Sequence, residues 1–153
     1  MSFHIRPVCA ADREAFLTMS REFYESDAVL HPIPEAYHAA TFDELMRSTC
    51  YLQCVFFETE DEQAGYALLN HAFQHEVGGR VTWVEELYVR PEHQGKGCAT
   101  QFFRWLEERL PAARYRLEVE PENERASALY RRMGYEALPY AQMIRDCKKE
   151  IDG

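Results

Sequence analysis

A short polar segment carries residues that could hold a bound anion. Gly95 and Gly97 flank Lys96 between a strand-like run that ends at Val89 and a helical pattern that begins at Gly97. Because glycine has no Cβ, backbone N–H groups at a helix start can approach a phosphate closely there. These residue types suit a diphosphate, although a plain tight turn has the same composition.

Two common nucleotide motifs are excluded by the same segment. A dinucleotide fingerprint needs a third glycine three positions after Gly97, but that position is Thr100. A P-loop needs Ser or Thr after Gly-Lys, whereas Lys96 is followed by Gly97. The anion, if bound, is therefore held by a different kind of loop.

Two adjacent carboxylates, Glu85 and Glu86, lie in the centre of the run V-T-W-V-E-E-L-Y-V. An amine with a pKa near ~10.4 is only about one part in a thousand neutral at physiological pH, so a base must take its proton before it can attack. Successive strand residues point to opposite faces, so one of the two carboxylates is expected to reach an acceptor. The alternative is a solvated or ion-paired carboxylate.

The elements that must position these groups follow from hydrophobic periodicity, and they form one domain over residues 1–153. The order is β-α-α-β-β-β-α-β-α-β-β, which predicts an α/β fold with a mixed sheet and helices on both faces. Expected strands are 3–7, 51–58, 64–72, 81–89, 115–120 and two short ones around Tyr135 and Met143, and expected helices are 12–23, 35–47, 97–110 and 122–133. Their expected inward faces are Phe16, Met19 and Phe23; Ala39, Phe42 and Met46; and Phe103, Leu106 and Leu110.

Composition narrows the class of partner. The chain has 17 Lys and Arg against 26 Asp and Glu, a net charge of −9. This balance argues against nucleic acid, which needs a basic stripe. The acidity either favours a cationic small molecule or peptide by long-range attraction or serves solubility alone. No apolar run approaches 18 residues and no signal peptide is recognised, so no membrane is expected. Five irregularly spaced cysteines indicate neither a disulfide framework nor a metal site, and a reducing cytoplasm is expected.

Two segments carry a family resemblance. The run 87–99, L-Y-V-R-P-E-H-Q-G-K-G-C-A, closely resembles the acetyl-CoA motif of the GNAT superfamily, with Gln94, Gly97 and Ala99 in its defining positions. Downstream, the run 123–135, N-E-R-A-S-A-L-Y-R-R-M-G-Y, resembles that family's second element. The resemblance covers nearly the whole chain and implies a mostly antiparallel, twisted sheet of six to seven strands flanked by about four helices.

The resemblance also implies an activity and a cofactor site. It indicates an N-acetyltransferase that moves an acetyl group from acetyl-CoA to a primary amine, without a metal. The diphosphate would be held by the loop backbone and the pantetheine arm by the strand before it. The residues implied for the cofactor are Leu87, Tyr88, Val89, Gln94, Gly95, Lys96, Gly97, Cys98, Ala99, Asn123 and Tyr130.

Catalytic roles are carried over in the same way. Tyr130 would protonate the departing thiolate, because a phenol is protonated at neutral pH. The strand V-E-E-L-Y-V looks like that of the polyamine branch, where the first acidic residue serves the amine, which maps to Glu85. Glu86 is the second choice. Asn123 would bond near the cofactor or cap its helix, and Tyr130 could instead be a core tyrosine.

The sequence is compatible with alternatives for the acceptor, for the activity and for the oligomeric state. The acceptor could be a small molecule or a protein, the chain could be a CoA-binding regulatory module without turnover, and a homodimer is possible. His71 and His75 would lie roughly 13 Å apart on a strand, too far to share a metal ion, and Cys98 is interpreted as a small packing residue. The connector after the first helix offers possible acceptor contacts, without assignment: Tyr24, Glu25, Asp27 and His31.

Overall fold

The computed structural model describes residues 3–147. The chain divides into two compact units, the first ending at Glu118 and the second beginning at Val119. The first unit holds every strand and three of the α-helices, and the second holds α4.

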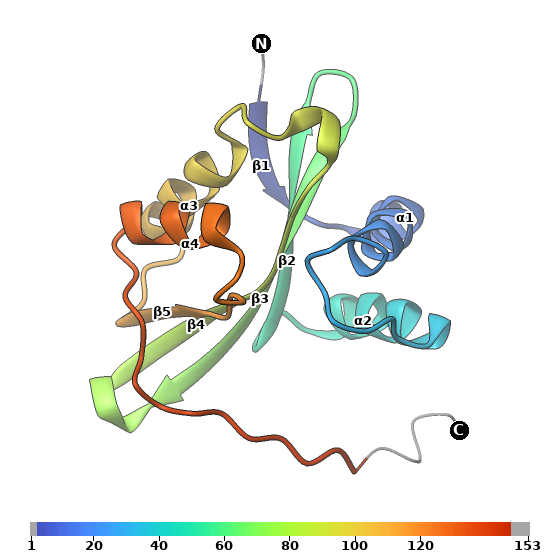
Figure 1. Ribbon diagram of the computed structural model, residues 1–153. Helices are drawn as coiled ribbons and strands as arrows, with labels where there is room; N and C mark the ends of the chain where they lie inside the picture. The colour runs from blue at the N-terminus through green and yellow to red at the C-terminus, as the bar shows by residue number, and fades with distance from the viewer. Residues whose placement is uncertain (1–2, 148–153) are drawn as a thin grey trace. The chain divides into compact units, whose positions relative to one another are not determined.

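The first unit is built on a five-stranded sheet in the order β1-β2-β3-β4-β5 (Figure 1). Neighbouring strands from β1 to β4 are antiparallel, and β4 and β5 are parallel. A parallel neighbour needs a crossover, which α3 supplies. The strands are β1 Phe3–Pro7, β2 Leu52–Thr59, β3 Gln63–Gln74, β4 Gly79–Val89 and β5 Arg114–Leu117.

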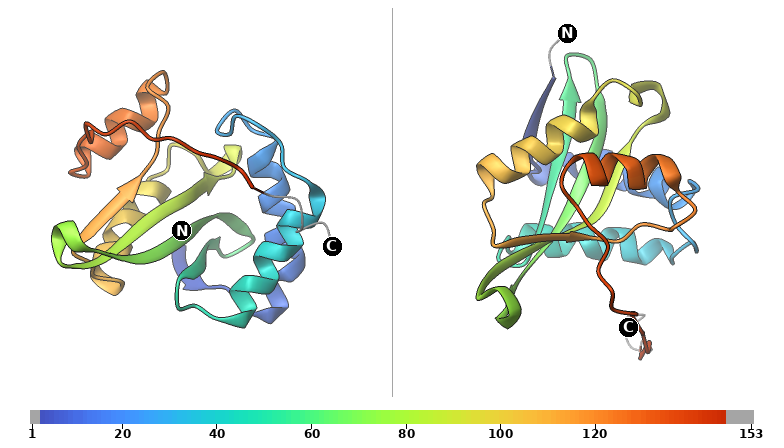
Figure 2. Two further views of the ribbon diagram at one scale, coloured as in Figure 1. Left: turned by 90° about the horizontal axis from the view of Figure 1, so that it is seen from below. Right: turned by 60° about the vertical axis from the view of Figure 1, so that its left-hand side comes forward.

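Helices cover both faces of this sheet. Figure 1 shows α1 (Arg13–Tyr24) and α2 (Glu35–Arg47) on one face and α3 (Cys98–Arg109) on the other, and Figure 2 shows the same arrangement from two further sides. None of the described helices combines the length and apolarity that a membrane span requires. The predicted α/β class is confirmed. The predicted order of the first nine helices and strands, from β1 to α4, is also confirmed.

The two faces have separate apolar cores. On the α1–α2 side, Phe16, Met19 and Phe23 point inward as predicted and pack with Phe42 and the β3 residue Tyr66. Burying such side chains contributes about 1.5–3 kcal/mol each. On the other side, Phe102 of α3 lies 5.5 Å from Phe57 of β2, measured between ring centroids. The predicted Phe103 and Leu106 are also fully buried there.

The predicted inward face of α2 is confirmed at Phe42, which is 2% exposed, and is wrong at Met46. Met46 is 41% exposed, whereas Leu45 is buried. His38 is also buried on this helix, and it is a polar residue that a search for apolar periodicity does not count. At the end of α3, Leu110 is only partly buried because the helix stops at Arg109, just before Pro111.

The second unit differs most from prediction. Its helix α4 (Glu124–Arg132) starts at the expected cap Asn123 and ends before Gly134, whose φ of 97° is the left-handed conformation that terminates helices. The two short strands expected around Tyr135 and Met143 are absent from the described residues of this unit. A strand exists only where a partner supplies a hydrogen-bonded ladder. Accordingly, several apolar side chains of this segment are exposed: Leu138, Tyr140, Met143 and Ile144.

Candidate active site

The second half of β4 lacks a neighbour on the β5 side. β5 pairs with β4 only over Val81–Val84, and its last residue, Leu117, lies opposite Val84. The residues from Glu86 to Val89 pair with β3 alone within the first unit. Their outer backbone groups therefore form an open edge of the kind to which an extended ligand can add as a strand.

The direction of the backbone groups identifies which residues face this edge. The Arg90 N–H donates to the Ala64 carbonyl of β3 at 2.8 Å, so the backbone N–H of Arg90 points toward β3. Because the direction of the backbone N–H and C=O groups alternates along a strand, those of Val89 and Leu87 point to the open edge. The Val89 carbonyl accepts a hydrogen bond from Gln94 Nε2 at 2.9 Å, which ties the next loop to the end of β4. The N–H groups of Leu87 and Val89 and the Leu87 carbonyl are therefore the groups that face an incoming ligand.

The loop between β4 and α3 has the conformation that the glycines allow. Gly95 and Gly97 have φ values of 76° and 84°, in the left-handed region that favours glycine. Gly97 is the N-cap of α3, no side chain caps the helix, and its first turn has no acidic residue. The free N–H groups and the helix dipole at Cys98 and Ala99 therefore fit a diphosphate. Lys96 is exposed in the same loop.

Contacts from β3 and α1 position the end of β4 on the side away from the open edge. A Cβ on Gly65 of β3 would lie 2.0 Å from the Tyr88 carbonyl oxygen, so only glycine allows this approach. The Tyr88 side chain is buried toward α1, where its hydroxyl donates to Glu22 at 2.9 Å. Arg90 binds the same carboxylate with two hydrogen bonds of 2.9 and 3.0 Å. Tyr88 thus contributes to the edge by positioning its neighbours.

A β-bulge places both candidate carboxylates on the same face of the sheet. Glu86 lies opposite Leu68 and Val84 opposite Leu69, which leaves Glu85 without a cross-strand partner. Glu86 accepts a hydrogen bond from Tyr66, and Glu85 accepts one from Asn70. Tyr66 and Asn70 are four residues apart on β3 and so share a face. The prediction that Glu85 and Glu86 point to opposite faces is wrong, because strand alternation fails at a bulge.

Glu86 is the less exposed member of the pair and is partly buried. Its two oxygens accept hydrogen bonds from Tyr24 of α1 at 2.6 Å and from Tyr66 at 2.8 Å. Burial raises the pKa of Glu86, the two phenols lower it, and the nearby charge of Glu85 raises it further. The net direction is upward. A carboxyl group with a raised pKa can hold a proton nearer neutral pH than an exposed one.

Glu85 and Tyr24 complete this cluster. Glu85 is exposed, and Asn70 Nδ2 donates to it at 3.1 Å. Burial, together with the charges of both carboxylates and the hydrogen bond to Glu86, raises the pKa of Tyr24, so its phenol stays protonated and acts as a donor. Tyr24 lies in the stretch whose polar residues were noted in the sequence without a role. Tyr66 carried no signal in the sequence, because it lies in an apolar strand.

The remaining predicted residues lie in the second unit. Asn123 is exposed and its Oδ1 accepts the Ala126 N–H at 3.1 Å, so it caps α4. Tyr130 lies on α4, and its ring centroid is 6.3 Å from that of Tyr135. Burial raises the pKa of Tyr130, which keeps the phenol protonated at neutral pH.

His71 and Cys98 are residue types that can bind metal or act as nucleophiles, but both have structural roles here. His71 is buried, bonded to Thr82 at 2.9 Å and to Gln53 at 3.0 Å, and burial lowers its pKa to about 4. Cys98 is buried at the start of α3, and burial raises the pKa of its thiol. A reactive cysteine has a lowered pKa instead. Both residues therefore serve packing.

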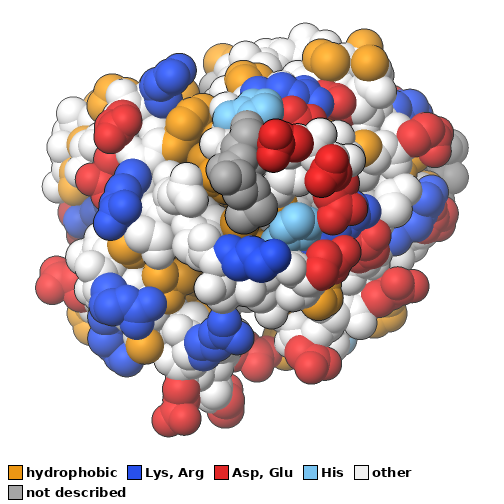
Figure 3. Space-filling model, turned by 90° about the horizontal axis from the view of Figure 1, so that it is seen from above, with side chains coloured by type: hydrophobic (Ala, Val, Ile, Leu, Met, Phe, Trp, Pro, Cys, Tyr) orange, Lys and Arg blue, Asp and Glu red, His pale blue; other side chains and the backbone are white. Residues whose placement is uncertain are grey.

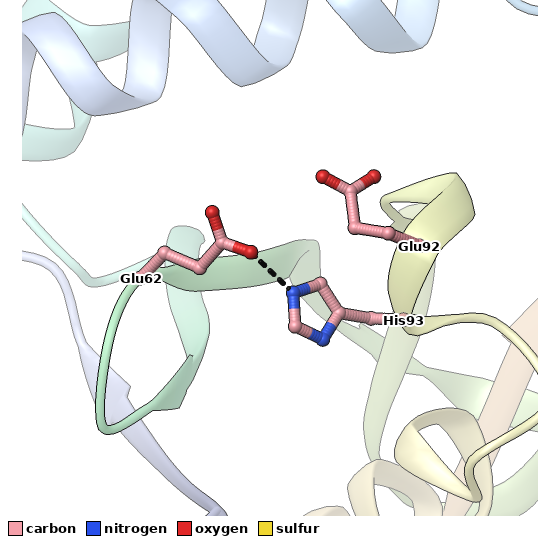
Figure 4. Close-up of side chains that lie close together, drawn as sticks. All are labelled: Glu62, Glu92 and His93. Carbon is pink, nitrogen blue, oxygen red and sulfur yellow. Dashed lines mark hydrogen bonds and ion pairs between the residues drawn. The ribbon is translucent and has the colours of Figure 1, made fainter.

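A third cluster joins the β2–β3 turn to the short helix η3 (Pro91–His93). Figure 4 shows Glu62 pointing at His93, whose Nε2 lies 2.7 Å from Glu62 Oε2, with Glu92 beside them. Ligand atoms of the three residues lie within 4.8 Å of one another. Figure 3 views this end of the molecule, where acidic side chains gather beside histidine side chains near the centre. Glu62 and Glu92 are exposed. We assign the cluster the structural role of holding η3, which precedes the glycines of the loop between β4 and α3, against the β2–β3 turn.

Comparison with known proteins agrees with this geometry. The model of the Acetyltransferase (GNAT) family matches residues 14–135. The chain belongs to the GNAT acetyltransferase family. It is also 30% identical over 132 residues to the uncharacterized protein ML0378 of Mycobacterium leprae (strain TN), an alignment that covers 84% of this chain and 33% of that protein. The chain thus spans about a third of that relative's length.

Solved structures share the fold. One is the aminoglycoside N-acetyltransferase AAC(6')-Iy in complex with the bisubstrate analogue CoA-S-monomethyl-acetylneamine, with a TM-score of 0.76, 16% identity, and coverage of 95% of this chain and 99% of that chain. Another is the ribosomal-protein-alanine N-acetyltransferase from Brucella melitensis biovar Abortus 2308, with a TM-score of 0.73, 18% identity, and coverage of 95% and 100%. At these identities the likeness concerns the fold alone.

Proposed function

We propose that this protein is an N-acetyltransferase that transfers an acetyl group from acetyl-CoA to a primary amine of a small molecule. The observation that carries the proposal is the open edge of β4, which leads directly into a glycine loop and an uncapped helix start. An amide-bearing arm and a diphosphate are the two parts of CoA that such a surface would hold. Membership of the GNAT acetyltransferase family supports the same activity.

The chain's own residues account for cofactor binding. The N–H groups of Leu87 and Val89 and the Leu87 carbonyl would bind the pantetheine amides, and the Leu87 N–H is the candidate oxyanion donor. The backbone from Gln94 to Ala99 would bind the diphosphate, with Lys96 adding a positive charge. When bound, acetyl-CoA supplies the acetyl group as a thioester. We also propose Asn123 and Tyr130 as cofactor-binding residues, because the run 123–135 resembles the second element of the family.

Two proton transfers are needed. As the amine nitrogen forms its bond to the acetyl carbon, Glu86 accepts the proton that the nitrogen loses, and Tyr130 donates a proton to the sulfur as the carbon–sulfur bond breaks. The sequence favoured Glu85 as the base. We favour Glu86, because its partly buried position against Tyr24 and Tyr66 and its raised pKa suit a proton acceptor near neutral pH. Exposed Glu85, on the same face, is proposed to attract the cationic amine.

The proposed acceptor is a cationic small amine. The net charge of −9 and the adjacent carboxylates Glu85 and Glu86 favour a positively charged ligand. The fold is shared with an aminoglycoside acetyltransferase, which acts on such a molecule. All five cysteines are free and three of them are exposed, which suits a reducing compartment, so we propose a cytoplasmic location.

A three-part experiment tests the function. Calorimetry with CoA should give a dissociation constant in the micromolar range, and acetyl-CoA turnover should be screened across polyamines, aminoglycosides, amino acids and N-terminal peptides. In the most active reaction, Glu86→Gln should lower kcat at least 100-fold and Glu85→Gln should mainly raise the KM for the acceptor. Tyr130→Phe should retain CoA binding while turnover falls.

The outcomes separate the alternatives. Binding of CoA without turnover in any class would indicate a regulatory module, and turnover of peptides alone would indicate a protein acetyltransferase. If Glu85→Gln abolishes kcat and Glu86→Gln does not, the roles are reversed. No heat of binding at millimolar CoA would refute the proposal as a whole.

A further inference from the structure

Arg116 of β5 is a partly buried arginine that stacks on an aromatic ring. Its guanidinium carbon lies 4.3 Å from the ring centroid of Trp83 on the neighbouring strand β4. Among residues 3–147, no hydrogen bond or ion pair joins Arg116 to another residue. Arg114, two residues earlier on β5, differs in this respect because it forms an ion pair with Glu76. A partly buried charge without a polar partner is costly, so the surroundings of Arg116 are informative.

Strand register places Arg116 on the face of the sheet that carries the two candidate carboxylates. Trp83 lies opposite Arg116 on β5 and opposite Asn70 on β3. Asn70 Nδ2 in turn donates a hydrogen bond to Glu85 at 3.1 Å. Because paired residues of neighbouring strands point to the same face, these side chains lie together across three strands. With Glu86, which is on the same face, we call these five residues the side-chain row.

The side-chain row has a negative end and a positive end. Glu85 lies two residues beyond Trp83 along β4, and Arg116 lies one strand away from Trp83. The rise along a strand and the spacing between strands therefore put the bases of the Glu85 and Arg116 side chains roughly 8 Å apart. Stacking on Trp83 also draws the Arg116 guanidinium over β4, into line with the carboxylates. The two ends form no ion pair with each other, and the gap between them has the size of a small ligand.

We propose that the acceptor is an amino acid whose ammonium group binds at Glu85 and Glu86 and whose carboxylate binds Arg116. This inference rests on the proposed function, and it narrows the cationic amine of that proposal to one that also carries an anionic group. In an α-amino acid the nitrogen and the carboxylate are about 3 Å apart. With a charge-assisted hydrogen bond of about 2.8 Å at each end, such a ligand reaches across about 9 Å, which fits the side-chain row.

The chemistry of Arg116 favours a carboxylate as the second group of the ligand. Stacking on Trp83 occupies the flat face of the guanidinium, whereas its N–H groups lie in the plane and remain available. A planar guanidinium binds a carboxylate with two parallel hydrogen bonds. An amino acid with one ammonium and one carboxylate is neutral overall, so the protein's net charge of −9 does not repel it. A polyamine would instead bring a second ammonium group toward Arg116, where like charges repel.

Matched acceptors test the proposal. Acetyl-CoA turnover is measured with the common amino acids, with their α-amides and with the corresponding decarboxylated amines. The best amino acid should have a kcat/KM at least 10-fold above those of its amide and its amine, because only the acid pairs with Arg116. An amide group makes the neighbouring amine less basic, so a preference for the acid must come from binding and not from a larger neutral fraction of the amine.

Substitution of Arg116 should remove this preference. Arg116→Gln should raise the KM for the best amino acid about 10-fold to 100-fold with kcat little changed, and should leave kcat/KM for the amide unchanged. Arg116→Lys should recover part of the loss, because it keeps the charge without the planar fork. Trp83→Leu removes the stacking and should raise the same KM about 3-fold to 10-fold.

Arg114→Gln is the matched control, because Arg114 lies on the same strand and face but is paired with Glu76. This variant should keep the wild-type preference for the acid. Equal kcat/KM values for acid and amide in the wild-type protein overturn the proposal and leave the proposed function intact. A preference that survives in Arg116→Gln, or that is lost equally in Arg114→Gln, also overturns it.

A binding measurement without turnover separates this inference from the proposed function. The chain has two tryptophans, so Trp105→Phe leaves Trp83 as the only one. In the presence of CoA, its fluorescence should change on titration with the amino acids but not with their amides, and Arg116→Gln should abolish the response. If the response is present but acetyl transfer is absent, the proposed function fails and the amino-acid site stands. If acetyl transfer occurs but no amino acid gives the response, the amino-acid site is refuted.

Discussion

The contact between Gly65 and the end of β4 allows a quantitative prediction. Replacing Gly65 with alanine would put a Cβ 2.0 Å from the Tyr88 carbonyl oxygen and 3.0 Å from the Val89 Cα. Carbon–oxygen contacts between adjacent strands are normally about 3.3–3.6 Å. The strands must therefore separate locally by about 1.3 Å, because neither neighbouring atom belongs to a flexible side chain.

The cost follows from what that separation breaks. The hydrogen bond from Arg90 N to Ala64 O, now 2.8 Å, would lengthen to about 4 Å and cease to be a bond. Overpacking costs about 1–3 kcal/mol and an unsatisfied buried group about 1–3 kcal/mol, so the expected loss of unfolding free energy is about 2–6 kcal/mol. For a chain of this size the melting temperature should fall by roughly 4–24 °C.

Function should change as well, because the displaced backbone forms the proposed cofactor edge. The KM for acetyl-CoA should rise about 10-fold, whereas the KM for the amine should change little. Gly78→Ala is the matched control: Gly78 has a φ of 60° in the β3–β4 turn, and a Cβ there meets nothing within 4 Å. That change should cost only about 1 kcal/mol and leave both KM values unchanged. A Gly65→Ala protein with wild-type stability and KM would show that the close approach described for these strands is incorrect.

Three further predictions concern other parts of the first unit. Asp12, held by Arg6 Nη1 at 2.7 Å, has a pKa lowered to about 2 by that hydrogen bond; Asp12→Asn should cost about 1–3 kcal/mol above pH 4, and the difference should shrink as the pH falls through 2, measured by urea unfolding at several pH values. Leu106→Ala should cost about 2–5 kcal/mol in thermal unfolding, since the side chain is fully buried, and a cost below 1 kcal/mol would contradict that burial. Gln94→Ala removes the bond to the Val89 carbonyl and should raise the KM for acetyl-CoA about 3-fold to 10-fold with little change in melting temperature, whereas an equal rise in the amine KM would contradict the role of the loop.

The outcome for the C-terminal strands shows where local patterns stop being informative. The stretch from Tyr135 to Ile144 has the aromatic and apolar residues of a strand, as do β2 and β3. β2 and β3 are joined by the short turn at 60–62 and pair with each other as antiparallel strands, so each has a partner close by in the sequence. The later stretch has no such partner among the described residues of its unit. Strand propensity reflects how well a residue packs against a neighbouring strand, so a segment with high propensity forms no strand when it has no neighbour to pair with.

The amino-acid sequence by itself determined the element order as far as α4, the glycine loop, and the family, because these depend on periodicity and on residues close together in the chain. Only the tertiary structure decided which groups meet. The bulge at Glu85 put both carboxylates on one face, the short β5 left the edge of β4 open, and the packing of α1 on the sheet brought Tyr24 to Glu86. These contacts join residues tens of positions apart, and their geometry is set by strand register and helix packing, which no local pattern of residues encodes.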